Sequence, residues 1–203
     1  MIQARPKPMS FEEFVAWLPQ DGRYELIDGN VFEMQPTGQY EEVGDFLDTQ
    51  LTLEVHRLQL PYKFPKRALI KAAGWGVGYL PDVVVVDRHL LKNEPHWERE
   101  ATIVNGSTVK LVVEVVSTNW ETDYARKYED YEAMGIAEYW IADYGGLGGK
   151  KYIGSPKQPT FSVCTLVGGE YQMQQFRGQE RIISAMFPEL NLTAAQILAA
   201  GEL

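Results

Sequence analysis

The chain has 203 residues, 45% of them hydrophobic, and its 28 acidic and 19 basic residues give a formal charge of −9. This length and composition predict one domain over residues 1–203, with enough apolar side chains for a sizeable core. The acidic balance disfavours a protein that binds nucleic acid through bulk charge alone. It leaves room for an enzyme that holds cations in an acidic cleft and contacts phosphates through local basic patches.

No apolar run approaches the ~20 residues that a membrane span needs, so we expect no membrane partner. The N-terminal stretch lacks the apolar core of a signal peptide. Cys164 is the single cysteine and cannot form an internal disulfide. These features together predict a cytoplasmic protein.

The N-terminal region, 10–34, is expected to hold a helix and a hairpin. Ser10 and Glu13 form a capping-box pattern at the start of the helix, which Pro19 ends. The stretch RYELIDGNVFEM then reads as two strands around an Asp28–Gly29 turn. A long amphipathic helix is predicted over 39–60.

Strands follow this helix. The segment 62–72 is predicted to be an exposed strand, because Pro65 would break a central ladder. Apolar strands are predicted over 79–87 and 108–117, and the polar stretch between them, 89–107, reads as an irregular surface loop.

A helix over 121–134, which Gly135 closes, and a strand over 137–144 complete the predicted core, 39–143. Its order is helix, strand, strand, strand, helix, strand. The pattern predicts an α/β fold, an α+β arrangement in which helices flank a mixed sheet. The C-terminal part, 160–200, reads as a β meander and a helix with Thr193 as N-cap.

Several motifs are set aside. GGLGGKK, 145–151, resembles a phosphate-binding loop, but glycine is missing at Tyr144 and the final residue is not Ser or Thr. GWGVGY, 74–79, does not fit the dinucleotide fingerprint. The three histidines lack metal-ligand spacing, and Cys164 has no obvious base.

Two carboxylates carry more information. Asp82 opens one apolar strand and Glu114 lies late in the next, so antiparallel pairing would make them neighbours. Period-two alternation puts Glu114 on the face of Val112 and Val116, where an ionised carboxylate needs a partner or a metal. The simpler alternative is that each carboxylate caps a strand end or pairs with an arginine.

The helical phase of 121–134 turns Lys127 towards the sheet, on the face of Tyr124, Tyr128 and Tyr131, and turns Arg126 towards solvent. The lysine could simply snorkel along apolar surface or pair with Asp123. Alternatively, it completes a site in which two carboxylates hold Mg²⁺ or Mn²⁺ and an ammonium acts on a phosphate. In that case, its loss should affect catalysis more than stability.

The ordered set of YELIDG, Pro81–Asp82, LVVEVVS, the helix with Lys127 and Tyr131, and GIAEYWIAD resembles the PD-(D/E)XK nuclease superfamily, and within it the bacterial Uma-type restriction endonuclease family. The resemblance covers about 23–192. It implies a restriction-endonuclease-like core and a metal-dependent endonuclease.

The resemblance further implies that Asp82 and Glu114 are metal ligands together with the backbone carbonyl of Val115. The superfamily's lysine position, two residues after the glutamate, holds Val116 here, which nominates Lys127 as a lysine moved into the following helix. A further acid from the first core helix is expected, and we prefer Glu42 to Glu41. Glu25 of the hairpin is a second candidate.

DNA is the expected substrate, with RNA or a small phosphodiester as alternatives. A homodimer is expected by analogy. Four basic residues before the site are candidate phosphate contacts or simply protectors of an edge strand: Lys63, Lys66, Arg67 and Lys71. The rival hypothesis is a catalytically degenerate module that binds nucleic acid or a protein partner.

Overall fold

The computed structural model describes residues 7–19 and 21–201. A six-stranded mixed sheet with the order β10-β9-β8-β7-β5-β3 forms its centre. Its strands are β3 (Tyr62–Lys63), β5 (Val83–Asp87), β7 (Val109–Val115), β8 (Glu138–Asp143), β9 (Thr160–Val167) and β10 (Glu170–Phe176). β7 and β8 run parallel, and the other neighbours pair antiparallel. The predicted mixed sheet is confirmed.

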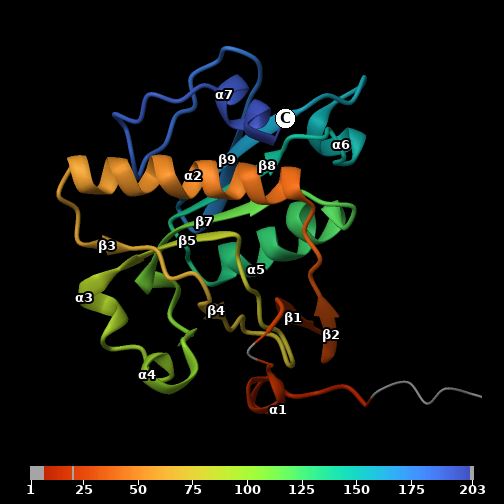
Figure 1. Cartoon of the computed structure of the whole chain (residues 1–203), viewed down its shortest axis with the longest axis vertical. Helices are drawn as coiled ribbons and strands as arrows, with labels where there is room; N and C mark the ends of the chain where they lie inside the picture. Colours follow the sequence, from red (N-terminus) through yellow and green to blue (C-terminus); the bar gives the residue numbers. More distant parts are fainter. Residues whose placement is uncertain (1–6, 20, 202–203) are drawn as a thin grey trace, which may run out of the picture.

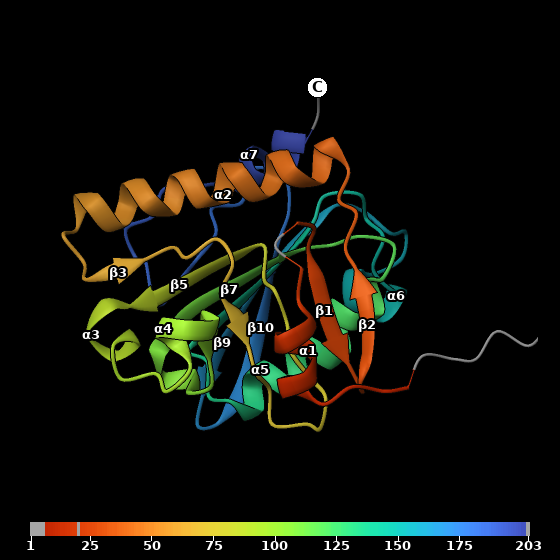
Figure 2. The same cartoon turned by 60° about the horizontal axis from the view of Figure 1, so that its bottom comes forward.

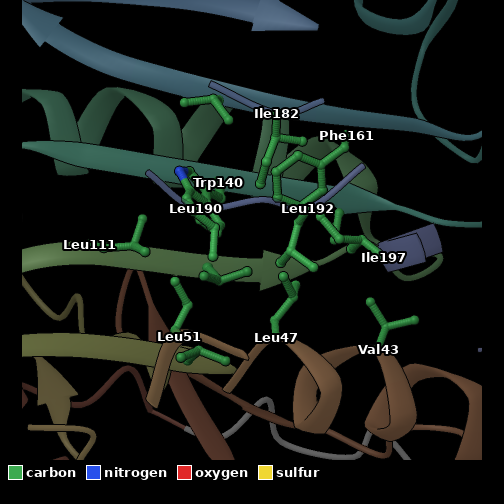
Figure 3. Close-up of a cluster of buried hydrophobic side chains, with 14 of the residues drawn as sticks. Val43, Leu47, Leu51, Leu111, Trp140, Phe161, Ile182, Leu190, Leu192 and Ile197 are labelled. Carbon is green, nitrogen blue, oxygen red and sulfur yellow. The ribbon is translucent and has the colours of Figure 1, made fainter. Parts of the chain in front are cut away.

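Helices cover both faces of this sheet (Figure 1). α2 (Gly38–Arg57) and the short C-terminal α7 (Ala194–Leu198) pack on one face, and α5 (Lys127–Ala133) packs on the other. Figure 3 shows side chains of α2 pointing towards those of the strands and of α7: Val43, Leu47, Leu51, Leu111, Trp140, Phe161 and Ile197. The side chains of β7 point alternately to these two faces of the sheet.

The side chains of β7 alternate between the two faces as the sequence pattern predicts. Val113 and Val115 belong to the cluster under α2, whereas Val112 and the following Val116 belong to the cluster under α5. Glu114 therefore faces α5, because successive side chains of a strand point to opposite faces. It is 1% exposed.

The N-terminal elements form a separate small layer beside the core (Figure 2). The capping box of Ser10 and Glu13 starts α1 (Phe11–Trp17), as predicted. β1 (Tyr24–Ile27) and β2 (Asn30–Glu33) make the predicted hairpin, whose turn residues Asp28 and Gly29 both have positive φ. α1 packs its buried aromatic rings against this hairpin.

The glycine-rich connector holds the hairpin to the core. Leu26 and Gly78 exchange two backbone hydrogen bonds, and Gly29 N–H donates to Gly76 O at 2.9 Å. A Cβ on Gly78 would lie 2.6 Å from the Phe11 ring, so only glycine permits this approach. The glycines of GWGVGY therefore serve close packing, in agreement with their exclusion as a nucleotide fingerprint.

Two segments differ from the expectation. The single exposed strand predicted over 62–72 is two short strands, because the chain turns just after Pro65, at Lys66 and Arg67. β3 lies at the edge of the main sheet, and β4 (Leu69–Ile70) is buried. β4 pairs in parallel with β6 (Thr102–Ile103), which lies within the supposed irregular loop 89–107. That loop also contains α3 (Arg88–Leu91), α4 (Trp97–Glu100) and the start of the 3₁₀ turn η1 (Gly106–Thr108).

A buried carboxylate organises this loop. Glu94 is 5% exposed and accepts hydrogen bonds from Val104 N–H at 2.9 Å and from the Thr108 hydroxyl. Such non-local contacts replace a regular backbone ladder, and they are not visible as a sequence period.

The remaining short elements are η2 (Thr122–Arg126), α6 (Lys150–Ile153) and the terminal 3₁₀ turn η3 (Ala199–Gly201). The predicted Thr193 cap of the last helix is present. Within residues 7–19 and 21–201, no helix combines the length and apolar character needed to cross a membrane.

Candidate active site

The register of β5 and β7 brings Asp82 and Glu114 together. Val83 pairs with Val113 and Val84 with Val112, so the next position along this antiparallel ladder sets Asp82 opposite Glu114. The predicted neighbourhood of the two strand carboxylates is therefore present in the fold.

Asp82 is held by donors from three other elements. Its Oδ1 accepts from Arg23 Nη2 at 2.9 Å, and its Oδ2 accepts from the Tyr40 hydroxyl at 2.6 Å and from Val115 N–H at 2.8 Å. The side chain is 3% exposed. The hairpin approach, α2 and β7 thus all orient this carboxylate.

Glu114 is held from the α5 side. Its Oε2 lies 2.9 Å from the Lys127 ammonium, and its Oε1 accepts from the Tyr131 hydroxyl at 2.9 Å. Lys127 and Tyr131 are four residues apart and so lie on one helical face. Lys127 points inward, as the helical phase predicts, with a side chain only 3% exposed.

Two further carboxylates meet the same ammonium. Glu25 Oε1 lies 3.0 Å and Asp123 Oδ1 lies 3.4 Å from Lys127 Nζ. Glu25 also accepts from Leu80 N–H at 3.1 Å, which ties the hairpin carboxylate to the segment before Asp82. The sequence left open whether Lys127 pairs with Asp123 or belongs to a metal site. Both hypotheses involve the same buried cluster of Glu25, Asp82, Glu114, Asp123 and Lys127.

The helix that carries Lys127 begins with a wide turn. η2 is a π-helical turn in which Lys127 N–H donates to Thr122 O, five residues earlier. π turns inside helices are frequent at functional sites. Here the turn leaves both Asp123 and Lys127 buried and facing Glu114.

Arg126 lies on the outer side of the helix, as the helical phase predicts, but it has ion-pair partners there. Its guanidinium pairs with both carboxylate oxygens of Asp28, at 2.7 and 3.2 Å, and with Asp130 at 3.2 Å. It remains 38% exposed. Because Asp28 is at the hairpin tip, this pair fastens the hairpin to the π turn.

The first core helix contributes differently from the expectation. Glu41, not the preferred Glu42, joins the network, because Glu41 Oε1 accepts from Arg23 Nη1 at 3.2 Å while Arg23 also holds Asp82. The sequence-based prediction favoured Glu42 over Glu41. It did not anticipate Arg23, which lies just before the hairpin and gives no periodic signal.

A cavity of about 600 Å³ opens beside this cluster. Its walls come from the hairpin, the start of α2, the loop after β7 and the loop after β8. It is lined by Glu25, Ile27, Phe32, Glu33, Met34, Gln35, Pro36, Thr37, Tyr40, Val115, Ser117, Thr118, Asn119, Glu121, Thr122, Asp123, Lys127, Tyr144 and Leu147.

The candidate phosphate contacts lie elsewhere. Lys66 pairs with Asp48 at 2.7 Å, Lys71 pairs with Glu12 at 2.6 Å, and Arg67 donates to Gly22 O at 2.7 Å. Together with the exposed Lys63, they are absent from the described lining of the cavity.

A family model identified as Uma2 and described as "Putative restriction endonuclease" matches residues 11–195. The chain belongs to the Uma2 family. The match spans all the residues of the cluster, from Arg23 to Tyr131.

One solved structure shares the Uma2 fold seen here. It is a protein from Anabaena variabilis ATCC 29413, described as a "putative nuclease belonging to DUF820", with a TM-score of 0.72 over 96% of this chain and 99% of that chain. The two sequences are 14% identical, so the likeness concerns the fold alone. No curated protein gives a significant match.

Burial shapes the charges of this Uma2 site. Loss of solvent raises the pKa of Glu114 well above its usual range and raises the pKa of Asp123 to about 7, although Lys127 opposes both shifts. Burial alone would lower the pKa of Lys127, but attraction by Glu114, Glu25 and Asp123 outweighs it and raises that pKa well above its usual value. The charge of Lys127 therefore does not fully offset the burial of the Glu114 and Asp123 carboxylates.

The donor chemistry fits a hard divalent cation. Fully ionised, the four buried carboxylates (Glu25, Asp82, Glu114 and Asp123) face two cationic side chains, Arg23 and Lys127, and carboxylate oxygens are the ligands that Mg²⁺ prefers. Within the part of the chain that the structure describes, no group of three or more His, Cys, Asp or Glu side chains is arranged so that it could hold a metal ion. The Lys127 ammonium itself lies among the carboxylates.

Proposed function

We propose that this Uma2 protein is an endonuclease that hydrolyses phosphodiester bonds in DNA with Mg²⁺ or Mn²⁺. The observation that carries the proposal is the buried pair Asp82 and Glu114 on neighbouring strands, with the Lys127 ammonium 2.9 Å from Glu114. Membership in a nuclease family supports the same reaction class.

In the proposal, Asp82 and Glu114 hold the cation with the backbone carbonyl of Val115. A divalent cation supplies polarisation of the phosphodiester and activation of water. Lys127 stabilises negative charge that develops on the phosphate, because an ammonium in a buried site interacts strongly with it.

The surrounding donors position the two acids. Burial raises the pKa of Tyr40 far above its usual value, so its phenol stays protonated and donates to Asp82. The Tyr131 phenol donates to Glu114 for the same reason. Arg23 completes the hold on Asp82.

Glu114→Gln tests the proposal. The change is nearly isosteric but removes the charge, so we expect metal-dependent cleavage of plasmid DNA to fall at least ~100-fold, the scale of losing an electrostatic catalytic group. Glu138→Gln is the matched control, because Glu138 is also a buried strand carboxylate but pairs with Ser184 and Ala185, outside the cluster. Equal activity of Glu114→Gln and native protein would reject the assignment.

One observation favours a second candidate, a nuclease-fold module that binds nucleic acid or a protein without cutting. All four carboxylate oxygens of Asp82 and Glu114 already face a donor of the protein itself. Binding of DNA without cleavage under either cation would support this candidate.

The proposal includes a cytoplasmic homodimer. Light scattering of the purified protein measures the oligomeric state, and a monomer at micromolar concentration would exclude the dimer. RNA and small phosphodiesters serve as competing substrates in the same cleavage assay.

A further inference from the structure

The proposed catalytic groups are recessed. The side chains of Glu114 and Lys127 are only 1% and 3% exposed, and Lys127 lines the cavity of about 600 Å³. A phosphodiester that enters this cavity therefore meets Lys127, whereas Asp82 and Glu114 do not belong to its lining. Its volume lies within the ~300–1,000 Å³ of pockets that enclose small-molecule ligands, which is the scale of a nucleotide.

Part of the cavity lining is apolar. Glu25 pairs directly with Phe32 across the hairpin, so both side chains lie on one face of β1–β2. Glu25 contacts Lys127, and Phe32 stands beside it with 47% of its surface exposed in the cavity lining. Strand alternation adds Ile27 and Met34 to this face.

The other lining residues are mostly polar or acidic. Ser117 and Asn119 follow β7, Thr122 begins the π turn, and Thr37 caps α2. Hydroxyl and amide groups of this kind can donate to phosphate oxygens and to base edges. The cavity thus joins an aromatic surface, polar donors and the Lys127 ammonium with four carboxylates, those of Glu25, Glu33, Glu121 and Asp123.

We propose that the cavity takes an unpaired nucleotide of single-stranded DNA, with its base stacked on Phe32 and its phosphate directed towards Lys127. The inference rests on the proposed endonuclease function and specifies its substrate. Aromatic side chains serve as stacking platforms for single strands because every base has a π-face.

Intact duplex fits the same geometry poorly. Its phosphates lie on a wide, stiff helix whose major groove alone is about 12 Å across, whereas the side chains of Asp82 and Glu114 are only 3% and 1% exposed. Enzymes that act inside such pockets take single strands or extrude one nucleotide from the stack.

The test offers one labelled oligonucleotide as a single strand, as a perfect duplex and as a duplex with a mismatched bubble. Cleavage is measured in Mg²⁺ and binding is measured separately by anisotropy in Ca²⁺. We expect the single strand and the bubble to be bound and cut at least tenfold better than the perfect duplex.

Phe32→Ala should weaken binding of the single strand at least about fivefold, the lower range for loss of one stacked base. Phe32→Tyr should retain it. Trp75→Ala is the control, because Trp75 is 63% exposed and packs beside Gly29 of the same hairpin but lies outside the cavity lining. Circular dichroism confirms the folding of each variant.

Cleavage of duplex as fast as single strand, or equal binding by Phe32→Ala and Trp75→Ala, would overturn the inference while leaving the endonuclease intact. A different outcome is preferential binding of single strands that depends on Phe32, without cleavage of any substrate. It would support the binding of a single-stranded nucleotide in the cavity and would overturn the proposed endonuclease function.

Discussion

Lys127 is an ammonium group surrounded by carboxylates from three different elements: Glu25 of the hairpin, Glu114 of the sheet and Asp123 of its own π turn. A buried charge of one sign is tolerated only with partners. Each partner here depends on the same lysine. Removal of Lys127 therefore takes the cationic partner from three buried carboxylates, an effect that the sequence-based expectation of a small stability change did not include.

Lys127→Met should destabilise the metal-free protein by about 3–5 kcal/mol near neutral pH, the usual cost of removing one partner of a buried ion pair. Urea unfolding in EDTA measures the change. Arg126→Ala should cost only ~0–1 kcal/mol, because its pairs are partly exposed. Similar unfolding midpoints for the two variants would contradict the conclusion that the ion pairs of Lys127 contribute more to stability than those of Arg126.

Glu138, which lies outside the cluster, makes the free energy of unfolding depend on pH. It is fully buried at the start of β8, and burial raises its pKa above 4.5 despite hydrogen bonds from Ser184 and Ala185. The folded protein thus binds this proton more tightly than the unfolded chain. The resulting stabilisation is present below pH 4.5 and is lost as the pH rises through the folded value.

Glu138→Gln is uncharged at every pH and removes this dependence. We expect the stability of the native protein relative to Glu138→Gln to fall between pH 4.5 and neutral pH. Paired urea titrations across this range measure the difference. A difference that is constant or that grows with pH would show that Glu138 is not the titrating group.

The hairpin β1–β2 is the element that assembles the site. It carries Glu25 towards Lys127, and three kinds of contact hold it: backbone bonds to the glycine-rich connector, packing against α1, and the Arg126–Asp28 pair at its tip. The π turn matters for the same reason, since it supplies Arg126 to the hairpin and Asp123 to the cluster.

Arg126→Ala should loosen this element without unfolding the protein. We expect faster amide hydrogen exchange over Tyr24–Glu33 and unchanged exchange in β7, because local opening needs only the contacts of one element to break. Arg57→Ala is the matched control, since Arg57 also makes a two-nitrogen contact with one carboxylate, that of Glu54, but on α2. Equal exchange of the hairpin in both variants would remove Arg126 from its attachment.

At the scale of the whole molecule, the two faces of the sheet differ in the side chains that cover them. The α2 and α7 face is an apolar core of aliphatic and aromatic side chains (Figure 3). The α5 face combines an apolar cluster with the charged site at the ends of β5 and β7. A ligand that binds this charged site should stabilise the whole fold by mass action.

Mg²⁺ or Mn²⁺ should therefore raise the melting temperature. At a hundredfold excess over Kd the gain is ~2.7 kcal/mol, which corresponds to about 5–10 °C for a chain of this size. Asp82→Asn should show a much smaller rise in differential scanning fluorimetry. The same rise in both proteins would exclude Asp82 from the cation site.

Local periodicity determined much of the site from the amino-acid sequence. Alternation along β7 predicts the face of Glu114, helical phase predicts the inward Lys127, and antiparallel pairing predicts Asp82 beside Glu114. These inferences succeed because each depends on the repeat of a single strand or helix, or on the pairing of two strands.

Only the tertiary structure decided which further residues join. The contacts of Arg23 and Tyr40 with Asp82, the participation of Glu41 rather than Glu42, and the pairing of β4 with β6 all join segments distant in sequence. No repeat within one segment encodes such contacts. They follow from the packing of several elements at once, because a buried carboxylate accepts whichever donors the assembled fold brings within hydrogen-bonding distance.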